Sequence, residues 1–224
     1  MRIRLVSCAS VVSLVLVASS ALADYGVSVK VGTLGIGVDV TRDLTDTLNG
    51  RLGFNMFSYD YSGTGGGEDG KKADEISAEL RLLSVPLLLD WHPWENGVRF
   101  SVGAAFNQNE VSLSVVPGNT VDLNDNEYAV SSLDGKVSFN PVAPYIGIGW
   151  GDSAEKANGS WHFSFDLGVM FQGAPKVDLS ATAAVPDQQA ALNVDLAEEK
   201  KSMEEDTKMF TMYPVLSLGI SYTF

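Results

Sequence analysis

Two histidines are the residues of this sequence at which acid–base chemistry would most readily begin. The chain holds His92 and His162, and His162 stands near Ser164 and Asp166, which together resemble a serine nucleophile with its base. In an extended strand, however, residues two apart point along one row and do not converge on a common atom. We therefore expect no catalytic residues and interpret the chain as a protein that is not an enzyme.

The types and spacing of residues also give weak support for metal and nucleotide sites. Two histidines fall short of a zinc set. Asp122, Asn124 and Asn126 begin like a calcium loop, but Glu127 replaces the turn glycine and Leu133 replaces the bidentate acid. The glycines of residues 32–37 and 65–67 match neither the dinucleotide fingerprint nor the phosphate loop. We expect no metal and no cofactor.

Length and charge narrow the class of protein further. The chain has 224 residues, of which 45% are hydrophobic, so it is long enough for one sizeable domain. It contains 28 acidic and 15 basic residues, which gives a formal net charge of −13. Because an acidic surface repels phosphate, nucleic acid is not expected as a partner.

The first residues have the features of a secretory signal peptide. Two arginines precede an apolar run over residues 5–18, and Ala21-Leu22-Ala23 has the small residues of a cleavage site. We assign residues 1–23 to the signal peptide and residues 24–224 to the exported domain. No later stretch of the sequence is apolar enough for a membrane-spanning helix.

Alternating apolar residues dominate the exported domain. In residues 210–224 apolar side chains occupy every second position, which is the period of a β-strand. Six further runs cover residues 27–40, 48–61, 76–91, 98–106, 137–150 and 161–171. Breaks in the alternation at Gly32-Thr33 and near Ser84 are interpreted as β-bulges.

The composition of the other face indicates where the apolar face points. That face is largely Gly, Ser, Ala and Asn, as at Gly103, Gly147 and Ser217. A soluble barrel would carry charges there, whereas small residues suit the crowded interior of a narrow membrane barrel. Charges of both signs remain on this face and could pair inside: Lys30, Asp39, Arg51, Glu79, Arg81, Arg99 and Asp166. The sequence predicts an all-β fold, an antiparallel up-and-down transmembrane β-barrel.

Aromatic residues gather beside the expected turns and at the chain end. They are Trp91, Trp94, Trp150, Trp161, Tyr222 and Phe224. Because amphipathic rings concentrate where a membrane meets water, we expect these residues at one interface. Phe57, Tyr59 and Tyr61 are expected in the opposite girdle.

The chain end carries the most specific resemblance. Residues 213–224 read Tyr-Pro-Val-Leu-Ser-Leu-Gly-Ile-Ser-Tyr-Thr-Phe, an alternating strand that closes on a phenylalanine. The sequence in this respect resembles the small outer-membrane barrels of Gram-negative bacteria, of the OmpA, OmpX and OmpW type, over residues 24–224. The resemblance implies an outer-membrane location and an assembly signal at Tyr222 and Phe224 that the barrel-assembly machinery reads. Lipids, lipopolysaccharide and this machinery are the expected partners of a monomer.

Strand number is left open between seven visible runs and the even number that such barrels require. We expect eight strands. Division of residues 25–40 at Gly32-Thr33 would supply the eighth, and so would residues 176–184. The first option is favoured because it leaves the long polar segments 62–74, 116–135 and 173–208 on the outer side.

A helical pattern interrupts the last long segment. Leu192 and Leu196 stand one turn apart, and Lys200 precedes Glu204 by one turn. We expect a short helix that begins near Asp187 and lies on the surface in water, with a plug inside the lumen as the alternative.

The expected function is a non-catalytic surface or envelope-integrity role. Two alternatives stay open: a channel for small solutes or hydrophobic molecules, and a soluble periplasmic binding protein of the lipocalin kind. Acidic loop residues such as Glu68, Asp69 and Asp122 also suggest loose bridging of Mg²⁺ or Ca²⁺ to lipopolysaccharide phosphates.

Overall fold

The structure is a computed structural model that describes residues 25–65, 74–94, 97–116, 120–124, 126–151 and 161–223. The predicted signal peptide and the terminal Phe224 lie outside the described residues. Strands predominate in the described part. None of its helices is long and apolar enough to cross a membrane.

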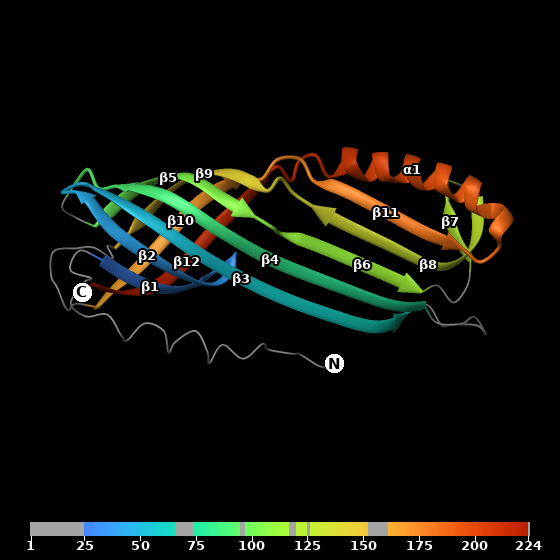
Figure 1. The fold of residues 1–224 in the computed structure, drawn as a ribbon, viewed down its shortest axis with the longest axis horizontal. Helices are drawn as coiled ribbons and strands as arrows, with labels where there is room; N and C mark the ends of the chain where they lie inside the picture. Colours follow the sequence, from blue (N-terminus) through green and yellow to red (C-terminus); the bar gives the residue numbers. More distant parts are fainter. Residues whose placement is uncertain are drawn as a thin grey trace.

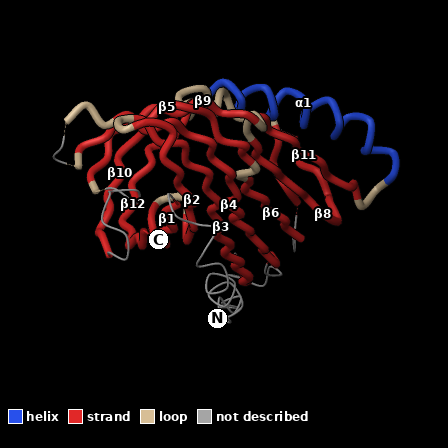
Figure 2. The backbone as a smooth tube through the Cα atoms, turned by 60° about the vertical axis from the view of Figure 1, so that its left-hand side comes forward, coloured by secondary structure: helices blue, strands red, loops and turns tan. Residues whose placement is uncertain are grey.

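Eight strands close into an antiparallel barrel, as the sequence predicts. The barrel follows the order β4-β3-β2-β1-β12-β10-β9-β5, and β5 pairs back onto β4. Its strands are β1 (Tyr25–Gly32), β2 (Gly35–Thr45), β3 (Leu48–Gly65), β4 (Asp74–Trp91), β5 (Val98–Asn107), β9 (Val142–Trp150), β10 (Trp161–Phe171) and β12 (Met212–Thr223). Figure 2 shows these strands around the barrel.

The eighth strand comes from a hairpin near the start of the described chain. Strands β1 and β2 pair up to Gly32 and Gly35, with Thr33 and Leu34 between them as the turn. Gly35 has a φ of 94°, a left-handed value that glycine adopts without strain. The bulge predicted at Gly32-Thr33 is therefore wrong, and the favoured division into two strands is confirmed.

Most large apolar residues of the barrel point away from its lumen. On β12, Leu218 is 61% exposed, whereas its neighbours Ser217 and Ser221 are buried. On β10, Phe163 is exposed and Asp166 is buried. This is the orientation expected from the small residues of the opposite face, and it gives the barrel an apolar outer wall.

A second sheet continues from one side of the barrel, and we call it the outer sheet. It consists of the distal halves of β3 and β4 with β6 (Glu110–Val116), β8 (Asn126–Ser138) and β11 (Lys176–Ala183), in the order β3-β4-β6-β8-β11. The short strand β7 (Thr120–Leu123) pairs with β8. Figure 1 shows the barrel at one end of the molecule and the outer sheet at the other. Residues 176–183 thus form a strand, but outside the barrel.

The two faces exchange character where the barrel ends and the outer sheet begins. Strand β4 keeps one register with β5 and β6 along its length, so it contains no bulge near Ser84. Residues of even number therefore stay on the lumen side from Asp90 to Ile76. Within the barrel the outward side carries Leu87 and Leu89, and the lumen side carries Asp90 but also Leu88. Beyond Ser84 the lumen side carries Leu82 and Leu80. The predicted second bulge is in fact this exchange of the apolar face.

A helix covers part of the apolar face of the outer sheet. After a 3₁₀ turn (Pro186–Gln188), α1 (Gln189–Asp206) runs along β11, as Figure 1 shows. Leu192 and Leu196 are buried against Tyr128 and Val130 of β8. The helix predicted near Asp187 is therefore present on the surface, with most of its residues exposed, and its Leu192 and Leu196 dock on the outer sheet; it does not plug the lumen.

Candidate functional site

Two regions could carry function, the barrel lumen and the outer sheet. The lumen holds a cluster of buried charges centred on Arg51 of β3. The Arg51 guanidinium Nε lies 2.8 Å from Asp90 of β4, and Nη1 lies 3.2 Å from Asp166 of β10 and 3.5 Å from Asp39 of β2. One cation thereby joins three strands of the barrel wall to its own.

Two further cations complete the cluster. Arg99 of β5 lies 2.7 Å from Asp166 and also donates to the Gly151 carbonyl oxygen. Lys30 of β1 lies 2.7 Å from Asp39. The cluster therefore contains three cations and three carboxylates, so its formal charges cancel. We call these six residues the lumen ion network.

Small residues make room for the lumen ion network. A Cβ atom at Gly149 would lie 2.8 Å from Arg99 Nε and 2.9 Å from Asp166 Oδ1. Ser101 donates to Asp90 over 2.5 Å, and Ser217 donates to Asp166 over 3.3 Å. The glycines and serines of the predicted interior face thus leave space for the charges or bind them.

The lumen ion network differs from the set predicted from sequence in three residues. Lys30, Asp39, Arg51, Arg99 and Asp166 lie together, but Glu79 and Arg81 are exposed on the outer sheet. Their assignment is corrected because β4 has no bulge, which places both on the side away from the lumen. Asp90 was missed, although it alternates with the outward residues Leu87 and Leu89 and so belongs to the lumen side.

An apolar layer closes the lumen on the side toward the outer sheet. It consists of Leu88, Ala105, Ala143, Tyr145, Met170 and Val215. The Tyr145 side chain reaches β10, where a Cβ atom at Gly168 would collide with its hydroxyl oxygen. Between this layer and the ion network the described residues leave a cavity of about 20 Å³. A cavity of this volume holds about one water molecule.

Side-chain amides lie where the strands pass from the barrel to the outer sheet. Asn107 donates to the Asn140 carbonyl oxygen over 3.3 Å, and Gln172 donates to the Phe210 carbonyl oxygen over 3.3 Å. Asn109 accepts from the Leu83 amide over 3.1 Å. These contacts satisfy backbone groups at the points where β5, β9 and β10 end.

Aromatic side chains surround the end of the barrel at which the chain terminates. Trp91, Trp94, Trp150 and Trp161 are all exposed, and the ring of Trp161 lies 5.0 Å from that of Tyr222. Phe224, the other predicted interface and assembly residue, lies beyond the described chain. The predicted opposite girdle is not formed as expected, because Tyr59 and Tyr61 belong to the outer sheet and lie on its lumen side.

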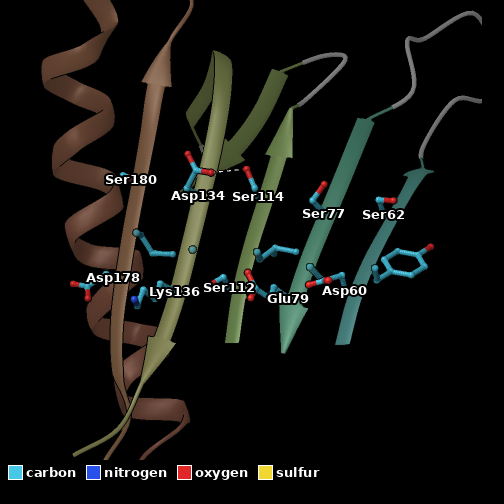
Figure 3. Close-up of a pocket in the computed structure, with 15 residues that line it drawn as sticks. Asp60, Ser62, Ser77, Glu79, Ser112, Ser114, Asp134, Lys136, Asp178 and Ser180 are labelled. Carbon is cyan, nitrogen blue, oxygen red and sulfur yellow. Dashed lines mark hydrogen bonds between the residues drawn. The ribbon is translucent and has the colours of Figure 1, made fainter. Parts of the chain in front are cut away.

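The other face of the outer sheet is polar and hollowed. A shallow pocket of about 710 Å³ is lined there by residues from all five strands. Figure 3 shows one cross-strand row of this face, formed by Asp60, Glu79, Ser112, Lys136 and Asp178. The row contains three acids and one base, so a bound partner would meet hydroxyl groups and a negative field.

Polar contacts fix α1 to the strands below it. Asp195 accepts hydrogen bonds from Tyr128 over 2.6 Å and from Asn126 over 2.9 Å, and these bonds lower its pKa below the ordinary 3.8. Asn124 donates to Glu198 over 3.2 Å. The asparagines that resemble the start of a calcium loop thus act as donors to α1.

The side chains singled out for chemistry take other contacts in the described part of the chain. Asp166, four residues after His162 in sequence, is held by Arg51 and Arg99. No group of three or more ligand-type side chains there is arranged to hold a metal ion. Among the residues singled out for chemistry, Asp166 therefore serves ion pairs.

Comparisons with known proteins agree with the fold. No protein-family model matches the chain, and no curated protein matches it. The solved structure of Acinetobacter baumannii CarO2 matches with a TM-score of 0.56 and 20% identity, over 91% of this chain and 99% of that one. Acinetobacter baumannii CarO matches with a TM-score of 0.53 and 20% identity, over 89% and 97%. The chain shares the barrel fold of these proteins.

Proposed function

We propose that the chain is an integral outer-membrane β-barrel with a non-catalytic role at the cell surface or in envelope integrity. The observation that carries this proposal is the apolar outer wall around a charge-filled lumen. Closed barrels satisfy every backbone group within the wall, so they can cross lipid without a helix. The fold shared with CarO and CarO2 supports the barrel architecture.

The orientation in the membrane follows from the two ends of the barrel. The end with the exposed tryptophans and the chain terminus would face the periplasm, and the outer sheet would stand outside the cell. Outer-membrane lipids and lipopolysaccharide would then surround the barrel. Tyr222 and Phe224 would form the signal for the barrel-assembly machinery, acting on a monomer.

A role at the cell surface is favoured over transport because the side chains in the lumen leave little space for a solute. The ion network and the apolar layer leave a cavity of about 20 Å³ between the described lumen residues. A channel for small solutes would require at least the apolar layer to move. The outer sheet, in contrast, offers broad exposed surfaces on both faces.

Fractionation and conductance measurements test this proposal together. The folded chain is expected in the outer-membrane fraction, with a gel mobility that changes on heating, and without current steps in planar bilayers. Recovery in an osmotic-shock supernatant would favour the soluble binding protein. Discrete current steps from verified insertions would favour the channel.

A further inference from the structure

The outer sheet has two edges, one of which is covered by side chains of α1. One edge is β11, which pairs with β8 on its other side. The second edge is the distal part of β3, because β2 pairs with β3 only as far as Met56. From Phe57 to Thr64, β3 has β4 on one side and no described strand on the other. Free edges are templates for pairing with another chain.

The β11 edge is blocked by side chains of α1. The Ala183 amide donates to Gln189 Oε1 over 2.8 Å, and Gln189 Nε2 donates to the Ala181 carbonyl oxygen over 3.1 Å. The Gln189 amide thus occupies a donor and an acceptor that a neighbouring strand would use. This edge is closed to further strands at its distal end.

The β3 edge lacks these protections. Side chains from Phe57 to Thr64 are exposed, apart from a half-buried Gly63. The segment contains no proline and no lysine, the residues that commonly blunt an edge, and its single charge is Asp60. No hydrogen bond from a side chain in the described ranges covers its free backbone groups.

We propose that the β3 edge from Phe57 to Thr64 binds an extended peptide segment of another protein as an additional strand. In strand addition, backbone hydrogen bonds give affinity and alternate side chains give specificity. Tyr59 and Tyr61, 42% and 53% exposed, would flank the added strand on one face. Ser58, Asp60 and Ser62 would flank it on the other.

Charge and aromatic placement define the chemistry of the segment. Asp60 pairs directly with Glu79 of β4, so two exposed carboxylates lie side by side near the edge. A cationic side chain on the added strand would meet both. Aliphatic side chains on its opposite face would pack beside the two tyrosines. The segment is therefore basic and apolar at alternate positions.

A second copy of this chain fits the edge less well. Two copies inserted in one membrane point the same way, so their β3 edges would approach in parallel. An antiparallel approach would need a copy from a facing membrane. The Asp60–Glu79 carboxylates of the two copies would then repel each other, in chains whose formal net charge is −13 each. A basic peptide meets neither obstacle.

Peptide binding to the full chain in detergent micelles tests the inference. The probe is a fluorescent peptide of alternating valine and lysine, compared with the same peptide N-methylated at every residue. The first peptide is expected to bind and the second to lose binding, because N-methylation removes the backbone donors of both edges. Equal binding of both would overturn the proposal.

Two matched variants place the site. Asp60→Lys is expected to weaken binding of the valine–lysine peptide by about tenfold or more. Asp178→Lys changes the acid of the same cross-strand row at the β11 edge and is expected to leave binding unchanged. Equal effects of the two variants on peptide binding would overturn the proposal. Dimers of the chain that are lost in Asp60→Lys would also overturn it, because a second copy would then occupy the edge.

The inference rests on the proposed function only for the exposure of the outer sheet outside the cell. Heat-dependent gel mobility of each variant reports the barrel separately from the binding. Recovery of the chain in the osmotic-shock supernatant would overturn the proposed function. The peptide measurements in micelles would still show whether the β3 edge binds an added strand.

Discussion

The barrel wall and the outer sheet share β3 and β4 but carry their apolar residues on opposite faces of these strands. On β4, Leu87 is exposed on the outside of the barrel and Leu88 is buried in the lumen. In the outer sheet the lumen side is apolar, and Glu79 on the other side is exposed. The barrel thus keeps its charges inside and the outer sheet keeps them outside. In the membrane orientation proposed above, such an exchange would occur where β4 leaves lipid and enters water.

The largest expected effect tests whether charge belongs inside the barrel. Arg51→Met would leave Asp39, Asp90 and Asp166 without their shared cation. We expect a loss of about 3–5 kcal/mol in the free energy of unfolding, because a buried charge without its partner is costly. Urea unfolding in lipid vesicles, followed by gel mobility, measures it.

The matched control for that variant lies on the outer sheet. Arg81→Met makes the same substitution at an exposed position and is expected to change stability by less than about 0.5 kcal/mol. Comparable losses in the free energy of unfolding for Arg51→Met and Arg81→Met would contradict the prediction that only the barrel holds its charges buried and paired.

A second prediction concerns the apolar face of the outer sheet alone. Leu192 of α1 is fully buried against β8, so Leu192→Ala should weaken the docking of α1 by about 2–5 kcal/mol through the cavity it leaves. Hydrogen exchange should show faster exchange in α1 and β11 with the barrel unchanged. Val194→Ala, at an exposed position of the same helix, serves as the control. Faster exchange throughout the barrel would show that the two regions fold as one unit.

A third prediction concerns the outside of the barrel. Leu218→Arg should cost about 2–4 kcal/mol if this position faces the middle of a bilayer, since an arginine must then enter lipid. Ser77→Arg, on the polar face of the outer sheet, should be tolerated. Unfolding in vesicles measures both, and equal tolerance would contradict the membrane assignment.

The smallest expected effect is a pH dependence of α1. Hydrogen bonds from Tyr128 and Asn126 hold the pKa of Asp195 below 3.8. The stabilisation is therefore complete above that value and is lost as the pH falls through the lowered pKa. The protection of α1 amides, measured relative to their intrinsic exchange rate at each pH, should be constant near neutral pH and fall below about pH 4. Asp195→Asn should remove this acid dependence, and an unchanged profile would show that other groups titrate.

The sequence predicted the barrel because the alternation and the small residues of its other face are local signals. Gly149 and Ser217 are examples, since both lie beside the lumen ion network. The helix was also visible, because Leu192 and Leu196 stand one turn apart. Its location over β8 was not, since burial against Tyr128 depends on contacts between distant segments.

The exchange of faces was the main feature that sequence reasoning misread. Leu80 and Leu82 occupy even positions and Leu87 and Leu89 occupy odd ones, which looks like a slipped register. In a strand buried on one face throughout, a bulge would be the natural explanation. In β4 the register stays constant while the apolar residues change from the outward side to the lumen side. An assumed bulge therefore places Glu79 and Arg81 inside the barrel and overlooks Asp90.

The most direct test of this account compares two positions on one face of β4. Single cysteines would replace Leu87 and Glu79 in a chain without Cys8, which lies in the predicted signal peptide. In lipid vesicles, a fluorophore at position 87 should be quenched by nitroxide-bearing lipids and one at position 79 by a water-soluble quencher. Quenching of both positions by the same reagent would contradict the exchange of faces.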